Sequence, residues 1–460
     1  MKYLLVIVAL GLSSCIPEER IWWSPNGEFA VVITDDQLIV TNQHGEISGR
    51  TEVRRDIVPI SASWLADSSA FICVRKRKLD RWQEMKASIP ASEVEMVDQM
   101  MPTVLPLLEV AARTSTDVKN LEGFIAGMSE HARSILICAI MRSYEADSAK
   151  TLQALGKFDS LLRETDIGYE FHELCLVQPN ALEKPRVITA SLIHAPFAPL
   201  VSPSSRFYAC LRLDPEGDDA ALEIRSVDQP DQSLIVSGKA SIAFDWTPDG
   251  RGVVFMSPIG SDNGPLYTIQ QAEVLTEKSR LLGHDDLKVK TLATALCPDH
   301  ARLAVLPDGR ILFATQSVQL PAVHVDGQVD SQLYLLAPDS GQLAPLPTAP
   351  GALPAFPGHF AVSPDGKTLA VVESNVDAVA VVDLASGRTQ LISEPHDGWK
   401  CRTLPSWRSS SELTHATIRD GKPQWVAWTE SGGVRALSAQ WPETMTKGWL
   451  EKSEPTKESP

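Results

Sequence analysis

The sequence lacks the short motifs that accompany several kinds of chemistry. It contains no C-x-x-C or H-E-x-x-H pattern for a metal, no G-x-x-x-x-G-K-[ST] loop for nucleotide phosphates and no G-x-S-x-G turn for a serine nucleophile. Basic residues are in deficit: 42 Lys and Arg stand against 58 Asp and Glu, and the formal charge of −16 opposes binding to nucleic acid. We therefore expect no catalytic motif, no metal, no cofactor and no nucleic-acid partner.

Long apolar runs are almost absent. Met1-Lys2 and the apolar run at 3–12 fit a secretory signal but are too short to cross a bilayer. No later segment reaches the length of about 18 apolar residues that spanning requires. The signal ends in Leu12-Ser13-Ser14-Cys15, which resembles the bacterial lipobox, where a cysteine after small residues becomes the acylated N-terminus.

This resemblance implies that residues 1–14 are a lipoprotein signal peptide and that Cys15 is the lipidation site. Two acyl chains give stable anchoring where one does not. We therefore expect a chain that is lipid-anchored to a membrane of the bacterial cell envelope and faces the periplasm or the cell surface. An ordinary cleaved signal with a chance cysteine is the alternative.

The other six cysteines have none of the dense spacing of a disulfide scaffold. Cys73, Cys175 and Cys210 fall inside apolar, strand-like runs, where cysteine usually behaves as a small buried hydrophobe. We predict buried thiols at these positions. A pair that the fold brings together could still be oxidised in an envelope compartment.

A strand-turn-strand unit recurs along the chain, most completely as Val362-Ser-Pro-Asp-Gly366 between two apolar runs. Proline sets φ at the first turn position and glycine accepts a positive φ, so the unit predicts a β-hairpin. The residue at the proline position marks each copy: Pro25, Ala66, Pro203, Pro248, Pro307, Pro364 and Ser409.

The spacing of these marks indicates a β-propeller. Three of the intervals are 41, 45 and 45 residues, which suits a four-stranded blade. We predict an all-β, seven-bladed propeller over residues 15–75 and 168–440, although six or eight blades also fit. The fifth copy is ambiguous, because Leu296-Cys-Pro-Asp-His300 and Leu306-Pro-Asp-Gly309 both match the unit. We favour the copy at Pro307.

The interval between the second and third marks is 137 residues, far longer than one blade. Within it the apolar period changes from two to about 3.6, so residues 76–167 are predicted to form a helical insertion between the second and third strands of the second blade. Asp117 and Asp147 stand where N-caps would, and Pro102 and Pro106 should break or kink the first helix. Residues 441–460 are polar and are predicted to be a disordered tail.

The strand-Pro-Asp-Gly-strand unit resembles the TolB-like branch of the WD-repeat propellers over residues 20–75 and 168–440. The chain departs from typical WD repeats because it has no Trp-Asp dipeptide, and from TolB because no α/β domain precedes the first blade. The resemblance implies the propeller fold and does not extend to the partners of TolB.

Two further groups of residues are better explained by structure than by function. Four copies of the unit have a tryptophan at the same position just before the turn: Trp23, Trp64, Trp246 and Trp407. These side chains are expected to fill the wedge-shaped space between neighbouring blades. The basic run at 75–78 is expected to be a solvated surface.

We predict a non-enzymatic scaffold that binds a protein partner in the envelope. The sequence does not indicate the oligomeric state of the scaffold. The alternative is a propeller-type hydrolase or lactonase-like enzyme with its site at the central channel. Three or four converging Asp, Glu, His or Asn side chains at a channel mouth would favour the enzyme, and an apolar groove on the helical insertion would favour the scaffold.

Overall fold

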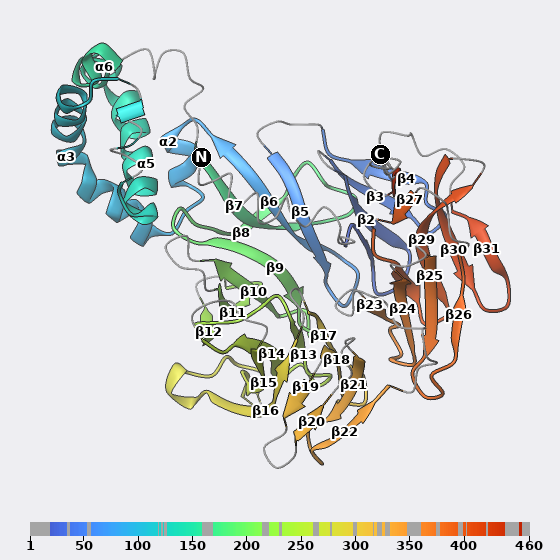
Figure 1. Cartoon of the computed structure of the whole chain (residues 1–460). Coiled ribbons are helices and arrows are strands. Elements are labelled where there is room, and N and C mark those ends of the chain that lie inside the picture. The colour runs from blue at the N-terminus through green and yellow to red at the C-terminus, as the bar shows by residue number, and fades with distance from the viewer. Residues whose placement is uncertain are drawn as a thin grey trace, which may run out of the picture.

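The computed structural model describes residues 19–452 except for segments 35–36, 53–56, 118, 121–122, 124–126, 159–168, 214–219, 230–231, 261–265, 277, 298–300, 316, 320–323, 327–331, 347–359, 374–377, 394–398, 402, 420–421 and 438–449. Seven antiparallel β-sheets are arranged around a common centre (Figure 1). The fold is a seven-bladed β-propeller, as predicted.

Each blade has four strands that lie side by side in the order of the chain. Blades 1 to 4 are β1 (Ile21–Trp23), β2 (Phe29–Ile33), β3 (Leu38–Asn42) and β4 (Ile47–Arg50); β5 (Ile57–Trp64), β6 (Phe71–Leu79), β7 (Tyr169–Val177) and β8 (Arg186–Ala190); β9 (Ala195–Val201), β10 (Phe207–Leu213), β11 (Ala220–Ser226) and β12 (Ser233–Ser237); and β13 (Phe244–Trp246), β14 (Gly252–Pro258), β15 (Leu266–Glu273) and β16 (Lys288–Leu296).

Blades 5 to 7 follow the same plan. Their strands are β17 (Leu303–Val305), β18 (Ile311–Thr315), β21 (Gln332–Ala337) and β22 (Gln342–Pro345); β23 (Phe360–Val362), β24 (Thr368–Glu373), β25 (Ala378–Asp383) and β26 (Thr389–Leu391); and β28 (Ser406–Ser409), β29 (Glu412–Arg419), β30 (Lys422–Thr429) and β31 (Gly433–Ala436). Because β17 and β18 flank the turn at Pro307, the preferred fifth copy is confirmed.

The turn between the first two strands has the predicted chemistry. In blade 6 the Gly366 amide donates to the Ser363 carbonyl at 2.8 Å, and Gly366 has φ +68°. Four of the first six blades place glycine at this position, but blades 2 and 3 place Ser68 and Ser205 there with φ 62° and 60°. Serine in this left-handed region is unfavourable unless its side chain gains a contact.

Apolar clusters fill every junction between neighbouring blades. Along β24, Leu369 and Val371 pack toward blade 5, whereas Ala370 packs toward blade 7. Residues two apart on a strand share a face, so each blade buries both faces. This explains why the inner strands are continuous aliphatic runs and not alternating ones.

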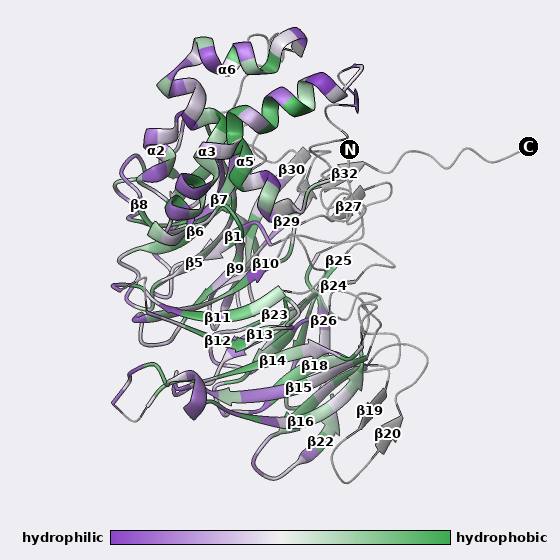
Figure 2. Cartoon of the chain, turned by 90° about the vertical axis from the view of Figure 1, so that its left-hand side faces the viewer, coloured by the Kyte–Doolittle hydropathy of each residue, from purple (hydrophilic) through white to green (hydrophobic). Residues whose placement is uncertain are grey.

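The helical insertion leaves blade 2 after β6 and returns at β7, between the second and third strands as predicted. It comprises α2 (Trp82–Lys86), α3 (Ala91–Thr114), α5 (Glu130–Ala146), α6 (Ser148–Leu155) and the 3-10 turn η1 (Gly156–Phe158). A second 3-10 turn, η2 (His284–Asp286), lies in blade 4. In Figure 1 the helices stand at one side of the ring, beside β6 and β7, and Figure 2 shows their mixed hydrophobic and hydrophilic faces.

One N-cap of the insertion is confirmed and one helix break is not. Asp147 caps α6, where its side chain accepts from the Lys150 amide at 3.1 Å. Pro102 and Pro106 lie inside the continuous helix α3, so of the predicted break or kink the break is wrong and the kink stays a prediction. Val97, Val104, Leu108 and Ala111 on the buried face of α3 keep the helix packed through both prolines.

Two short pairings were not predicted. The hairpin β19 (Ser317–Gln319) and β20 (His324–Asp326) leaves blade 5 and extends the outer edge of blade 4 by pairing with β16. In addition, β32 (Leu450–Lys452) pairs with β27 (Trp399–Cys401). The prediction of disorder throughout 441–460 is therefore wrong for the three residues of β32.

Among the described residues, no helix has both the length and the apolar character that crossing a membrane would require.

Candidate functional site

The hairpin turns contact one another around one face of the propeller. The Ser68 hydroxyl of blade 2 accepts from the Asn26 amide of blade 1 at 3.1 Å. The Ser205 hydroxyl of blade 3 accepts from the Ala66 amide of blade 2 at 2.7 Å. These bonds account for the two serines with positive φ. They also account for alanine at the proline position of blade 2, because proline has no N–H to donate.

A cavity of about 410 Å³ opens at the centre of this face. Its lining comes from the inner strands and turns of blades 1 to 5 and includes the turn prolines Pro25, Pro203, Pro248 and Pro307. Within the described part of the chain, Asp245 on β13 is the one carboxylate that lines it. We call this cavity the channel mouth.

Asp245 connects blade 4 to blade 5. Its two carboxylate oxygens accept from the Trp246 amide and the Val305 amide, each at 2.8 Å. Burial raises the pKa of Asp245 to about 6, against the opposing effect of these two donors. A carboxylic acid with this pKa can exchange a proton near neutral pH.

A serine performs the same connecting role between blades 2 and 3. The Ser63 hydroxyl accepts from the Val201 amide at 3.0 Å, and Ser63 and Val201 occupy the same positions in their blades as Asp245 and Val305. A hydroxyl is thus sufficient for the contact between blades. The carboxylate of Asp245 adds a titratable group to the channel mouth that the fold does not require.

The four tryptophans pack between blades, as predicted, and each also donates a hydrogen bond to the preceding blade. The indole nitrogens of Trp64, Trp246 and Trp407 donate to the carbonyl oxygens of Trp22, Leu200 and Ala361 at 2.8 to 3.0 Å. In blade 1 the Trp23 indole donates to the Thr414 hydroxyl at 2.8 Å, which in turn donates to the Ser406 carbonyl. The tryptophans therefore fasten the ring at four of its junctions.

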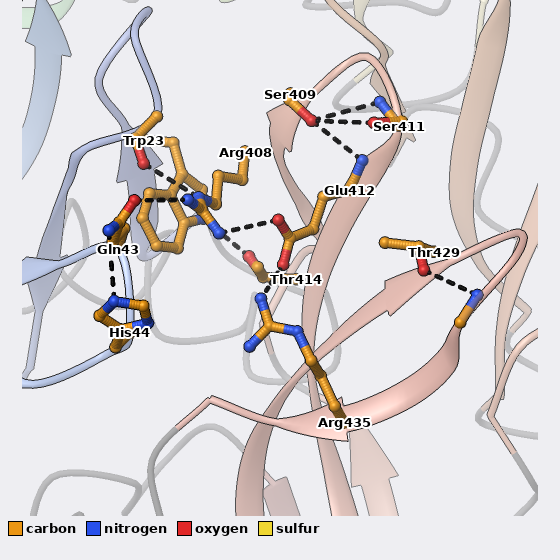
Figure 3. Close-up of polar contacts among 12 residues, drawn as sticks. Trp23, Gln43, His44, Arg408, Ser409, Ser411, Glu412, Thr414, Thr429 and Arg435 are labelled. Carbon is orange, nitrogen blue, oxygen red and sulfur yellow. Dashed lines mark hydrogen bonds and ion pairs between the residues drawn. The ribbon is translucent and has the colours of Figure 1, made fainter.

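Polar contacts close the ring between blades 7 and 1 (Figure 3). The Arg408 guanidinium donates to the Gly27 carbonyl at 2.9 Å, to Gln43 Oε1 at 3.2 Å and to Glu412 Oε2 at 2.8 Å. It also lies over the ring of Trp23, 5.5 Å from the centroid. Glu412 also forms an ion pair with Arg435, so one partly buried carboxylate orients two arginines.

A buried carboxylate attaches the insertion to blade 2. Glu93 of α3 is 5% exposed and accepts from the Ser191 hydroxyl at 2.6 Å and the Leu192 amide at 2.7 Å, both after β8. Burial raises the pKa of Glu93, although these donors oppose the rise. The Tyr169 hydroxyl lies 2.8 Å from both Ser134 Oγ and the Leu192 carbonyl. The insertion is thus joined to the propeller by a shared polar and apolar interface.

The basic run at 75–78 is not the solvated surface that was predicted. Arg75 bonds the buried carboxylate of Glu173 at 2.5 Å, and Arg77 lies 3.6 Å from the same group. On the opposite face of β6, Lys76 pairs with Glu170. The alternation of a strand places the two pairs on different faces, and the run is an ion-pair element of blade 2.

The predicted buried thiols are confirmed at Cys73, Cys175 and Cys210, which are unpaired and at most 2% exposed. Burial raises the pKa of Cys73 and of Cys210 to about 12, so neither thiol is reactive in the folded chain. Cys15 lies outside the described residues.

Converging polar side chains at the channel mouth would favour an enzyme, and an apolar groove on the insertion would favour a scaffold. Each of these features is only partly present. Among the described residues that line the channel mouth, Asp245 is the one Asp, Glu, His or Asn side chain, where the enzyme prediction required three or four. No group of three His, Cys, Asp or Glu side chains arranged to hold a metal occurs in the described part of the chain. On the insertion, partly exposed methionines of α3, such as Met96, Met100 and Met101, pack beside its core.

No family model and no curated protein matches this chain. Among solved structures, TolB from Acinetobacter baumannii is 18% identical with a TM-score of 0.40, covering 57% of this chain and 58% of its own. The putative TolB from Agrobacterium tumefaciens is 16% identical with a TM-score of 0.37, covering 55% and 84%. An oligogalacturonate lyase in complex with manganese is 14% identical with a TM-score of 0.42, covering 81% and 74%.

The chain thus spans just over half of the length of the Acinetobacter protein. At these identities the likeness concerns the propeller fold alone.

Sequence reasoning missed Asp245, Glu93 and Arg408. A lone polar residue in an apolar strand was the available signal for Asp245. For Glu93 the signal was its position on the helical period of Val97, Val104 and Leu108. The role of Arg408 in closing the ring carried no signal, because its partners in blade 1, Gly27 and Gln43, lie 381 and 365 residues away in sequence.

Proposed function

We propose that this chain is a lipid-anchored scaffold of the bacterial cell envelope that binds a protein partner through its helical insertion. The observation that carries the proposal is the rigid attachment of the insertion. Glu93 of α3 bonds the Leu192 amide of blade 2, Tyr169 of blade 2 bonds Ser134 of α5, and the helices share one apolar core with Phe171 and Ala190 of that blade.

A rigid helical element presents a constant surface, which reduces the ordering cost of association. The long helix α3 also carries thioether side chains at the edge of its core, and methionine adapts its shape to different partner surfaces. The anchor is proposed from the lipobox resemblance at Cys15. Together these features suit a protein that is held at a membrane and captures another protein.

Site-specific photo-crosslinking in the native envelope tests this proposal. A benzophenone amino acid is placed at Val110 of α3, which is 43% exposed, and in a matched variant at Val289 of blade 4, which is 44% exposed. We expect a discrete protein adduct from position 110 and none from position 289. Equal adducts from both positions, or none from 110, would contradict the insertion as the binding element.

The anchor has a separate test. Cys15→Ser should move the chain from the detergent phase to the aqueous phase on detergent partitioning. Unchanged partitioning would remove the lipoprotein proposal and leave the test of the insertion standing.

A second candidate function rests on the channel mouth. Asp245, with its pKa near 6 in a cavity of about 410 Å³, could serve as a general acid or base for hydrolysis of a lactone or a glycoside. Asp245→Ser is the informative variant, because Ser63 shows that a hydroxyl maintains the equivalent contact between blades. We expect any hydrolysis of a lactone or nitrophenyl glycoside panel to show a pH inflection near 6 and to vanish in Asp245→Ser. Activity that survives this change would exclude Asp245 from the chemistry.

A further inference from the structure

A second cavity lies between blades 6 and 7, on the face that carries the hairpin turns. Its volume is about 520 Å³, within the range of small-ligand pockets. The turn that joins β25 to β26 forms one wall, and the turns that join β28 to β29 and β30 to β31 form the other. We call this cavity the 6/7 groove.

The floor of the 6/7 groove is apolar. Trp407, Trp428 and Val381 line it and belong to the core between the two blades. The indole N–H of Trp407 is already bonded to the Ala361 carbonyl at 2.9 Å. The three side chains are 7 to 8% exposed, so the floor presents a small area, mainly of carbon, to a ligand.

The rim is rich in groups that both donate and accept hydrogen bonds. Five hydroxyls and one carboxamide surround the floor, and all six can pair with a hydroxyl or an amide of a ligand in either direction. These residues are Thr368, Ser410, Ser411, Thr429, Ser431 and Gln390.

The charges at the rim are largely paired. Arg388 of blade 6 bonds Glu430 of blade 7 at 2.9 Å, and both side chains are more than 70% exposed. The Asp383 carboxylate accepts from the Ser386 amide and hydroxyl at 2.7 and 2.6 Å, which lowers its pKa and keeps it an acceptor. The remaining charge is negative, so an anionic ligand is disfavoured.

We propose that the 6/7 groove binds a neutral oligosaccharide. A sugar ring carries apolar C–H faces and a periphery of hydroxyls, which match the apolar floor and the hydroxyl-rich rim. The groove is separate from the channel mouth and from the insertion, so this proposal goes beyond the scaffold function and does not depend on it.

The test uses the full chain in a detergent without a sugar headgroup and measures binding by calorimetry and saturation-transfer NMR. The probes are chitotetraose and cellotetraose as neutral sugars, tetragalacturonate as an anionic sugar, and a Gly-Ser tetrapeptide. We expect saturable binding of at least one neutral sugar, with tetragalacturonate and the peptide at least tenfold weaker. No binding of either neutral sugar, or tighter binding of the peptide or the anionic sugar, would overturn the proposal.

Variants locate the site. Gln390→Ala removes a rim partner and should weaken binding at least fivefold, and Ser411→Trp should fill the groove and abolish it. Both positions are exposed, so the fold should be retained, as circular dichroism can verify. Val434→Ser, at a residue of β31 that is 38% exposed and outside the groove lining, is the matched control with unchanged affinity. Sugar binding that persists in folded Ser411→Trp would also overturn the proposal.

Discussion

Replacing Arg408 with alanine tests how the propeller ring is closed. The Arg408 side chain is 17% exposed and reaches blade 1 through the Gly27 carbonyl, Gln43 and the ring of Trp23. Arg408→Ala removes all three contacts and leaves the Gly27 carbonyl without this donor. Glu412 keeps its other partner, Arg435, so its charge is not left unpaired.

The expected loss follows from these contacts. Hydrogen bonds that involve a charged group contribute about 1.5 to 3 kcal/mol each, and a cation over an aromatic ring contributes about 0.5 to 1 kcal/mol at an exposed site. Because the site is partly solvated, we expect Arg408→Ala to lower the free energy of unfolding by about 2 to 4 kcal/mol. Arg408→Lys should lose about half as much, since it keeps the charge but not the planar fork.

Equilibrium unfolding in urea, followed by tryptophan fluorescence, measures this loss. The stacked pair Trp23 and Trp425, 5.5 Å apart, lies at the same junction and reports on its opening. Arg388→Ala is the matched control, because the Arg388 and Glu430 side chains are 72% and 74% exposed and such pairs contribute little. If Arg408→Ala were no more destabilising than Arg388→Ala, the account of ring closure would be refuted.

Three further predictions concern the junctions and pH. Trp246→Phe removes the indole donor to Leu200 and should cost about 1 kcal/mol in urea unfolding; no loss would show that the bond is dispensable. Ser205→Ala should be less stable than Ser205→Gly, because both lose the bond to Ala66 but only glycine tolerates φ 60° without strain; the reverse order in thermal melts would contradict this. Burial lowers the pKa of His415 to about 4. The unfolded chain therefore binds more protons than the folded chain below pH 6.5, and the free energy of unfolding should fall as the pH is lowered from 6.5 to about 4. The fall should be smaller in His415→Gln, and equal slopes would reject His415 as its source.

The propeller itself was predictable because its turns carry local chemistry. Proline and glycine at fixed offsets identify the turns at Pro25, Pro248 and Pro364, and the apolar runs beside them bury both faces of each blade. The weaker copies at Ala66 and Ser409 lack the proline of the unit but keep a tryptophan two residues before it, Trp64 and Trp407.

The features that escaped prediction depend on distant partners. The strands β19, β20 and β32 are each three residues long. The hairpin β19–β20 is stabilised by pairing with β16 and the strand β32 by pairing with β27, which belong to other parts of the chain. Helix α3 continues through two prolines because tertiary packing of its buried face outweighs local preference. The carboxylate of Asp245 could not be placed at the channel mouth until the ring was known.

Removing the insertion tests the proposed function most directly. Strands β6 and β7 remain paired up to Leu79 and Tyr169, so an Asn-Gly turn between these residues should close blade 2 without residues 80–168. Affinity recovery from crosslinked envelopes, analysed by mass spectrometry, compares this variant with the intact chain. We predict that the partner is recovered with the intact chain and lost with the folded, still anchored deletion variant. Recovery of the same partner in equal amount with both would contradict the scaffold proposal.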